Sequence, residues 1–132
     1  DADLRNSGLH EIFDNVPKQG AGLSGFLAGS DDYQQSIVNL ESHPFDILPS
    51  GRKPPNPGEL LAGPRMQSLL EKLGATYDHI IVDSPPVLGL ADALEIASVV
   101  DGVVFVVEAN SGKIRTIQQA LSRLRCCSYQ AR

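Results

Sequence analysis

The sequence has few of the residue types that mark specialised protein classes. Its 132 residues include no tryptophan, and its two cysteines, Cys126 and Cys127, are neighbours. Neighbouring cysteines rarely bridge each other, and two residues cannot complete a four-ligand zinc site. The cysteine content therefore argues against a structural zinc site and favours a reduced, intracellular protein.

Long apolar runs are absent as well. No run approaches the roughly 18–20 apolar residues of a membrane-spanning helix, and no basic-then-apolar leader marks secretion. We therefore expect any membrane association to come from a partner or from segments outside this sequence.

Basic residues are fewer than acidic ones, 11 against 16, so the net charge is −5. This argues against a general nucleic-acid binder, which needs a basic surface. Residues 111–132 nevertheless contain five basic and no acidic residues. Such a segment is typical of a solvated helix face, and contact with acidic lipid or a protein partner is the other interpretation. The five basic residues are Lys113, Arg115, Arg123, Arg125 and Arg132.

Local signals predict several helices. A short helix over 23–27 should end at Gly29, and Asp31 and Asp32 should open another toward Ile37. Apolar spacing predicts a helix over 64–73, with Pro64 in its first turn and Gly74 in a left-handed cap. Further helices are expected over 92–97 and along the apolar stripe from 114 to 124, whereas residues 51–64 should form an ordered surface connection.

Three strand candidates alternate with these helices, at 45–48, 80–82 and 102–109. The last is apolar at successive positions, as expected of a parallel strand covered on both faces. This order predicts one α/β domain with three layers, a parallel sheet between helices. In such a sheet, ligands bind beyond the carboxyl ends of the strands.

Acidic residues stand where such a site is expected. Asp83 follows the Ile80–Val82 run and resembles a Walker B aspartate that holds Mg²⁺ or its water; a turn cap is the alternative. Asp1 and Asp3 would point to the same side of an extended segment. Such a pair suits metal binding or a proton acceptor, and a solvated terminus is the alternative.

Together these motifs resemble a known family. In order they are DADLR (1–5), GLSGFLAG (22–29), FDILPSG (45–51), PPNPGELL (54–61) and IIVDSPP (80–86) with ADAL (91–94). They resemble the bacterial tyrosine kinases of capsule and exopolysaccharide systems, relatives of the MinD and ParA type of P-loop ATPases. The resemblance covers roughly residues 1–125 and implies a P-loop NTPase-like fold.

The resemblance also implies roles for four residues. Asp1 and Asp3 match the Walker A′ acidic pair, of which one aspartate accepts the tyrosine proton and helps to hold Mg²⁺. Asp83 matches the Walker B aspartate on the magnesium side, and Arg5 matches the arginine of the Walker A′ motif, where we expect it to contact the nucleotide. The implied catalytic residues are Asp1, Asp3 and Asp83, with Asp1 and Asp83 at the metal.

The sequence departs from the family at both ends. The Walker A loop lies upstream of DADLR in the family, and we therefore expect residues 1–132 to be an N-terminally truncated, partial catalytic domain. The segment ANSGKIR (109–115) does not replace it, since it lacks the first glycine and a Ser or Thr after Lys113, and it is interpreted as a turn. The family's tyrosine-rich tail is reduced to Tyr129, a tail residue or a phosphate acceptor.

The resemblance implies an ATP- and Mg²⁺-dependent protein-tyrosine kinase that autophosphorylates and regulates polysaccharide synthesis and export. The parent protein should be cytoplasmic at the inner face of the plasma membrane, with a membrane-bound polysaccharide co-polymerase or activator as partner. Protein tyrosines would be its substrates, self-association is expected, and nucleic acid is not. Residues 1–132 alone should be inactive. Two alternatives stay open: an inactive regulatory domain of a chain-length protein, and a ParA- or MinD-type ATPase.

Overall fold

The computed structural model describes residues 1–109 and 113–128 and divides into two compact units, Asp1–Pro85 and Pro86–Arg132. The turn predicted for 109–115 includes residues 110–112, which lie outside the described residues. Tyr129 and Arg132 also lie outside them.

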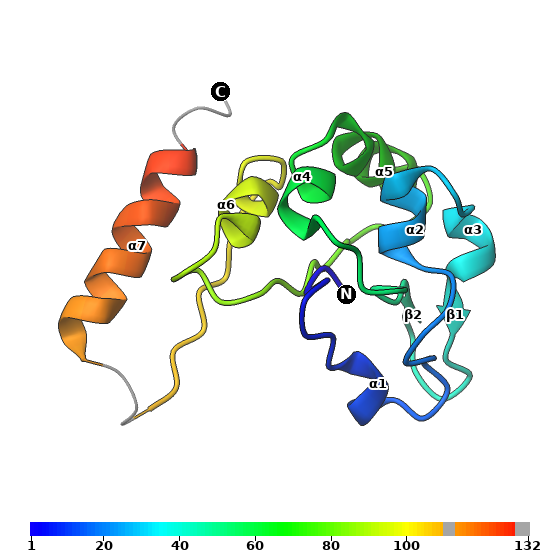
Figure 1. The fold of residues 1–132 in the computed structure, drawn as a ribbon. Coiled ribbons are helices and arrows are strands. Elements are labelled where there is room, and N and C mark those ends of the chain that lie inside the picture. The colour runs from blue at the N-terminus through cyan, green and yellow to red at the C-terminus, as the bar shows by residue number, and fades with distance from the viewer. Residues whose placement is uncertain (110–112, 129–132) are drawn as a thin grey trace. The chain divides into compact units, whose positions relative to one another are not determined.

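Most of the regular structure in the first unit is helical. Its helices are α1 (Leu9–Ile12), α2 (Leu23–Ala28), α3 (Tyr33–Ser36), α4 (Pro57–Leu61) and α5 (Pro64–Gly74) (Figure 1). Two short strands, β1 (Val38–Asn39) and β2 (Asp46–Ile47), pair antiparallel. The second unit contains α6 (Asp92–Ala97) and α7 (Ile114–Ser128), which pack against each other.

The predicted ends of the short helices are confirmed. Gly29 closes α2 with a φ of 86°, a left-handed conformation that glycine adopts without steric cost. The Asp32 side chain caps α3 by accepting a hydrogen bond of 3.0 Å from the Gln34 backbone N–H. Arg65 adds a tertiary contact, because its guanidinium donates to the carbonyl of Phe26 near the end of α2 (3.0 Å).

Helix α5 begins at Pro64 as predicted and buries one apolar face, but the predicted cap at its end is wrong. Gly74 belongs to the helix, and the following Ala75 is right-handed with a φ of −77°. The amides of Thr76 and Tyr77 both donate to the carbonyl of Leu73, so this helix end is satisfied without a left-handed residue.

The parallel sheet predicted from the sequence does not appear among the described residues, whose strands are the antiparallel β1 and β2. The 45–48 candidate is confirmed in part by β2, whereas 80–82 and 102–109 belong to no strand. The expected burial of 102–109 is also wrong: Val104 is 91% exposed and Val106 83%. A strand requires a hydrogen-bonded neighbour, and neither segment has one that would complete a ladder.

The core of the first unit lies where α2, α4 and α5 pack together, with Leu61, Met66 and Leu69 as its most deeply buried large side chains. Helix α4 was expected to be a surface connection, but its Pro57 and Leu61 are buried. A second, smaller cluster surrounds β1 and β2 and contains Val16, Leu40 and Ile47.

The start of α2 lies directly on the loop that follows β2. The amides of Leu23 and Ser24 donate to the carbonyls of Pro49 (2.8 Å) and Ser50 (2.9 Å), and the buried Ser24 hydroxyl donates to the Arg52 carbonyl (2.6 Å). Gly22 is buried against the same loop. A side chain at Gly22 would therefore separate α2 from this loop.

We predict that Gly22→Ala destabilises the chain by about 2–3 kcal/mol, because overpacking of a tight contact displaces backbone. An added Cβ would lie 2.5 Å from the nitrogen of Gly51 and 2.6 Å from the oxygen of Pro49, and both of these atoms are backbone. Gly74→Ala is the matched control, since a Cβ there meets nothing within 4 Å. Urea unfolding should show that variant unchanged or slightly more stable; equal losses in both variants would contradict the packing argument.

A second prediction concerns alkaline pH. The Tyr77 hydroxyl donates to Asp46 (2.7 Å), and this hydrogen bond, with some burial, raises the pKa of Tyr77 above its usual value of 10.0. A raised pKa means that the fold favours the neutral phenol, so this stabilisation is complete below pH 10 and is lost as the pH rises through the folded-state pKa. Tyr77→Phe should cost about 1 kcal/mol at pH 8 and less at pH 11. A difference from the unmodified chain that stays constant over this range in urea unfolding would contradict this assignment.

Candidate active site

The DADLR loop lies between two segments that are far apart in the sequence. The Asp1 nitrogen donates to the carbonyl of Leu48, and the Ala2 amide donates to the carbonyl of Asp83, both at 2.8 Å. Leu48 directly follows β2, and Asp83 ends the Ile80–Val82 run. These two hydrogen bonds bring Asp1 and Asp83 to one edge of the first unit.

The carboxylates of Asp1 and Asp3 organise the loop itself. Asp1 accepts hydrogen bonds from the Asp3 amide (3.1 Å) and the Ser7 hydroxyl (2.7 Å). Asp3 accepts from the amides of Arg5 (3.1 Å) and Asn6 (2.8 Å). Short-range bonds of this kind are typical of aspartates that hold a turn. The acidic pair is therefore ordered and partly buried, so the alternative of a freely solvated terminus does not fit.

Asp83 acts on the same region electrostatically. Burial lowers the pKa of the Asp1 amino group, and the negative charge of Asp83 opposes that shift in part. The Asp83 side chain is exposed to solvent, while Pro85 two residues later is buried. The Asp83 carboxylate is thus open to solvent, although the buried Pro85 lies only two residues later.

The donor set suits a hard cation. Carboxylate oxygens are ligands that Mg²⁺ prefers, and Mg²⁺ commonly uses one or two carboxylates together with water and substrate phosphates. Asp1 and Asp83 could supply two. No group of three or more His, Cys, Asp or Glu side chains suited to a metal occurs in the described part of the chain, so an all-protein metal cage is not found there.

Arg5 lies in the same loop and is partly buried. Its backbone amide is held by Asp3, so the arginine is fixed at the start of the segment that leads to α1. The structure thus brings Asp1, Asp3, Arg5 and Asp83 into one region, through one loop and one backbone hydrogen bond.

Sequence reasoning missed Ser7, whose hydroxyl holds the Asp1 carboxylate. No motif distinguishes this serine, because its role depends on the loop returning to Asp1. It also missed that the loop after β2 supports the site, although Pro49, Ser50 and Gly51 did indicate a turn. Gly51 has a φ of 81°, and a side chain there would meet Ser24 and Gly22.

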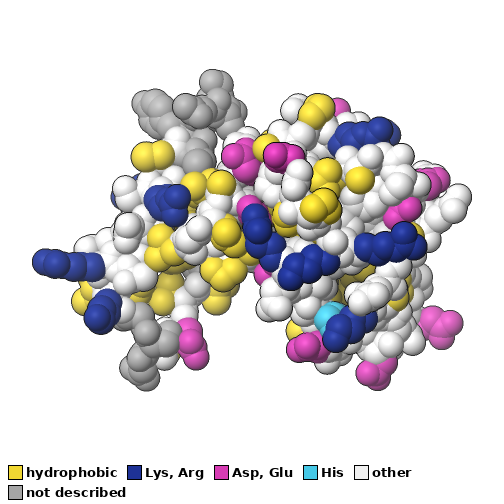
Figure 2. All heavy atoms as spheres, viewed as in Figure 1, with side chains coloured by type: hydrophobic (Ala, Val, Ile, Leu, Met, Phe, Trp, Pro, Cys, Tyr) yellow, Lys and Arg dark blue, Asp and Glu magenta, His cyan; other side chains and the backbone are white. Residues whose placement is uncertain are grey.

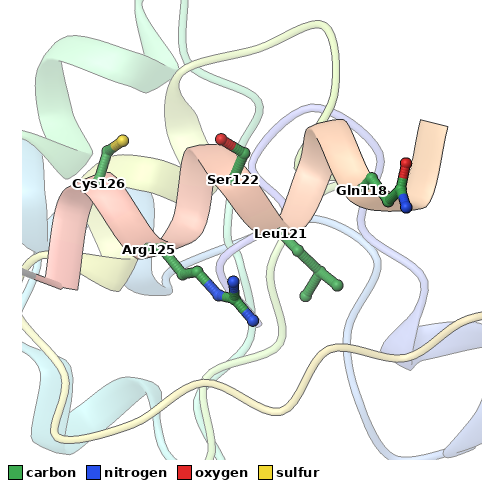
Figure 3. Close-up of a pocket in the computed structure, with 5 residues that line it drawn as sticks. All are labelled: Gln118, Leu121, Ser122, Arg125 and Cys126. Carbon is green, nitrogen blue, oxygen red and sulfur yellow. The ribbon is translucent and has the colours of Figure 1, made fainter. Parts of the chain in front are cut away.

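The second unit has a separate hollow of about 490 Å³ along α7 (Figure 3). One face of a single helix lines it, and none of the predicted site residues does. Figure 3 shows the Leu121 and Arg125 side chains extending to the same side of α7. The lining residues are Gln118, Leu121, Ser122, Arg125 and Cys126. We therefore take the DADLR region as the candidate active site.

Comparison with known proteins agrees with the family resemblance, although no family profile matches the chain. A putative tyrosine-protein kinase in the cps region of Klebsiella pneumoniae is 37% identical over 125 residues, which are 95% of this chain and 17% of that protein. The tyrosine-protein kinase YwqD of Bacillus subtilis is 37% identical over 123 residues, which are 93% of this chain and 50% of that protein.

Solved structures show the same relationship. The kinase domain of Escherichia coli tyrosine kinase ETK matches with a TM-score of 0.89 and 34% identity, over 96% of this chain and 49% of that one. The chimerical protein CapA2B2 matches with a TM-score of 0.88 and 31% identity, over 96% of this chain and 55% of that one. The chain thus spans about half of these structures, which have the P-loop NTPase fold expected from the sequence. It belongs to the bacterial tyrosine kinase family, the capsule- and exopolysaccharide-related kinases, and corresponds to part of the kinase domain.

Proposed function

We propose that the protein containing this chain is an ATP-dependent protein-tyrosine kinase that autophosphorylates and regulates synthesis and export of a surface polysaccharide. The observation that supports this most is the position of the DADLR loop. Its first two backbone nitrogens donate to the carbonyls of Leu48 and Asp83, so the backbones of Asp1 and Asp83 lie at one edge. Phosphoryl transfer depends mainly on positioning and on electrostatic stabilisation, which acidic residues fixed on a rigid edge can provide through a cation.

We assign separate roles to the four residues. Asp1 and Asp83 would hold Mg²⁺, which when bound bridges and neutralises the phosphates of ATP. Asp1 or Asp3 would accept the proton of the tyrosine hydroxyl, with the loop hydrogen bonds fixing the carboxylate for that transfer. Arg5 would contact the nucleotide phosphates, for which a guanidinium is well suited.

We further propose that the parent protein works at the inner face of the plasma membrane beside a membrane-bound polysaccharide co-polymerase or activator. The match to CapA2B2, a chimera by its name, supports a kinase that works with a second component. Protein tyrosines, including those of other copies of the kinase, would be the substrates. Among the helices described, none combines the length and hydropathy needed to cross a membrane.

One observation favours the inactive regulatory domain as a second candidate. The carboxylates of Asp1 and Asp3 already accept hydrogen bonds from their own loop, so a purely structural role would account for them. The two candidates differ in whether the parent protein phosphorylates tyrosine, since only the kinase would do so.

We predict that Asp1→Asn and Asp83→Asn each lower tyrosine autophosphorylation by about 100-fold or more, in a longer form of the kinase that includes a Walker A loop. Asparagine keeps the shape and can still accept hydrogen bonds, but it loses the charge that binds a cation. Asp78→Asn is the matched control, because Asp78 is exposed and lies outside the site. Phosphotyrosine detection with ATP and magnesium measures the effect. Unchanged rates in both variants would exclude the assigned roles, whereas no phosphotyrosine from the unmodified longer form would favour the regulatory domain.

We also predict that the 132-residue chain alone binds Mg·ATP weakly, with a Kd of about 1 mM or higher. Backbone amides and the lysine of a Walker A loop provide most phosphate contacts in this class of protein, and residues 1–132 contain no such motif. Isothermal titration calorimetry can compare the chain with the longer form. Micromolar binding by the shorter chain would show that its own residues are sufficient for nucleotide binding.

A further inference from the structure

The first unit contains two tyrosines, Tyr33 and Tyr77, and their hydroxyl groups have different surroundings. The Tyr77 hydroxyl donates to the Asp46 carboxylate at 2.7 Å, a strong hydrogen bond because the acceptor is charged. The Tyr33 hydroxyl has a long contact of 3.5 Å, in which the side-chain amide of the exposed Gln34 donates to it. Of these two tyrosines, Tyr33 therefore has the phenol oxygen that is more open to a reaction partner.

The Tyr33 ring lies beside a lysine at the surface of the unit. It packs edge-on against the ring of Phe26, with centroids 5.4 Å apart. The Lys72 Nζ lies 5.7 Å from the Phe26 centroid and 6.0 Å from the Tyr33 centroid. Lys72 is exposed and Tyr33 is partly exposed. A cation over a ring at an exposed site contributes about 0.5–1 kcal/mol, so the lysine can exchange this contact for an anionic partner at little cost.

The backbone at Tyr33 is held only lightly. Tyr33 is the first residue of α3, a single turn that packs against α2 (Figure 1). Its bonds include the Asp32 cap on Gln34 and the Ser36 hydroxyl, which donates to the Asp32 carbonyl at 2.9 Å. An isolated turn has little stability of its own, and local opening of such a segment costs much less than global unfolding. Tyr33 can therefore extend toward a second molecule while the core stays folded.

We propose that Tyr33 is a phosphate acceptor for a second copy of the kinase and that Lys72 pairs with the phosphate once it is attached. This inference rests on the proposed function. The phenol oxygen of Tyr33 forms a bond to the γ-phosphorus of ATP. The bond from that phosphorus to the β–γ bridging oxygen breaks, and ADP leaves with its electron pair. The phenol proton passes to Asp1 or Asp3 of the copy that holds ATP.

The charges around Tyr33 explain why the lysine matters. A phosphotyrosine carries a charge of about −1.5 to −2 at pH 7, and Asp31 and Asp32 precede Tyr33 in the sequence. Repulsion from these carboxylates would oppose an added phosphate. Lys72 supplies the cation that offsets this repulsion, from the last turn of α5. Substitution of Lys72 removes the attraction and leaves the repulsion in place.

The first test uses the 132-residue chain as substrate, with Tyr129→Phe to remove its third tyrosine. The chain is incubated with the longer form of the kinase, ATP and magnesium, and mass spectrometry locates the phosphate. Tyr33 should be phosphorylated about tenfold faster than Tyr77 or more, since Tyr77 must first lose its bond to Asp46. Tyr33→Phe should remove most of the phosphate from the chain, whereas Tyr77→Phe is the matched control and should leave it unchanged.

The outcomes separate this inference from the proposed function. Phosphotyrosine on the longer form, with none at Tyr33 of the shorter chain, would overturn the inference and leave the kinase function intact. Equal rates at Tyr33 and Tyr77 would also overturn it, because the structure distinguishes their hydroxyl groups. No phosphotyrosine on either protein would overturn the proposed function, and this inference with it.

A second measurement tests the pairing with Lys72 and needs no kinase activity. The chain is made by semisynthesis with a phosphate already on Tyr33, and ³¹P NMR follows the phosphate as the pH changes. A nearby cation favours the dianion, so Lys72→Gln should raise the pKa of the phosphate by about 0.4. Lys18→Gln is the control, because Lys18 is exposed and belongs to another loop. Identical titration of the Lys72→Gln and unsubstituted chains would show that Lys72 does not pair with the phosphate.

Discussion

Two backbone hydrogen bonds, from Asp1 to Leu48 and from Ala2 to Asp83, determine how the acidic residues of this chain come together. They join segments that are 47 and 81 residues apart, and the side chains at this edge depend on them. The backbones of Asp1 and Asp83 are held at the same edge by these two bonds. The proposed Mg²⁺ site depends on this arrangement, because carboxylates carried on these two segments are ligands that the cation prefers.

The support of this edge comes from tight backbone contacts more than from side-chain burial. The loop after β2 follows the residue that accepts from Asp1, and α2 lies on that loop through Gly22, Leu23 and Ser24. Glycines at 22 and 51 allow the two backbones to approach closely. The GLSGFLAG and FDILPSG motifs, which are separate in the sequence, therefore pack together as one structural element. This element supports the candidate active site indirectly, because it fixes the position of Leu48.

Helix ends were the part of the fold that the sequence predicted best, because their causes are local. Gly29, Asp32 and Pro64 each act within a few residues, and the structure places each as predicted. Gly74 was predicted wrongly because two amides beyond the helix satisfy the carbonyl of Leu73 instead. For the site, the common edge of DADLR and Asp83 followed from the rule for parallel strands. The contact between Ser7 and Asp1 could not be predicted, since it requires the path of the loop.

The strand predictions fell short for a different physical reason. Strand formation depends on partners elsewhere, and the runs with the strongest strand composition, 80–82 and 102–107, are among the most exposed apolar parts of the described chain. Figure 2 shows hydrophobic side chains open to solvent on the unit that contains α7. Burial of one valine or isoleucine side chain contributes about 1.5–3 kcal/mol, so several such residues in water forgo stabilisation comparable to that of a whole domain. The composition of these runs is therefore typical of strands that pair with neighbours. Their exposure shows that they do not form such pairs among the described residues.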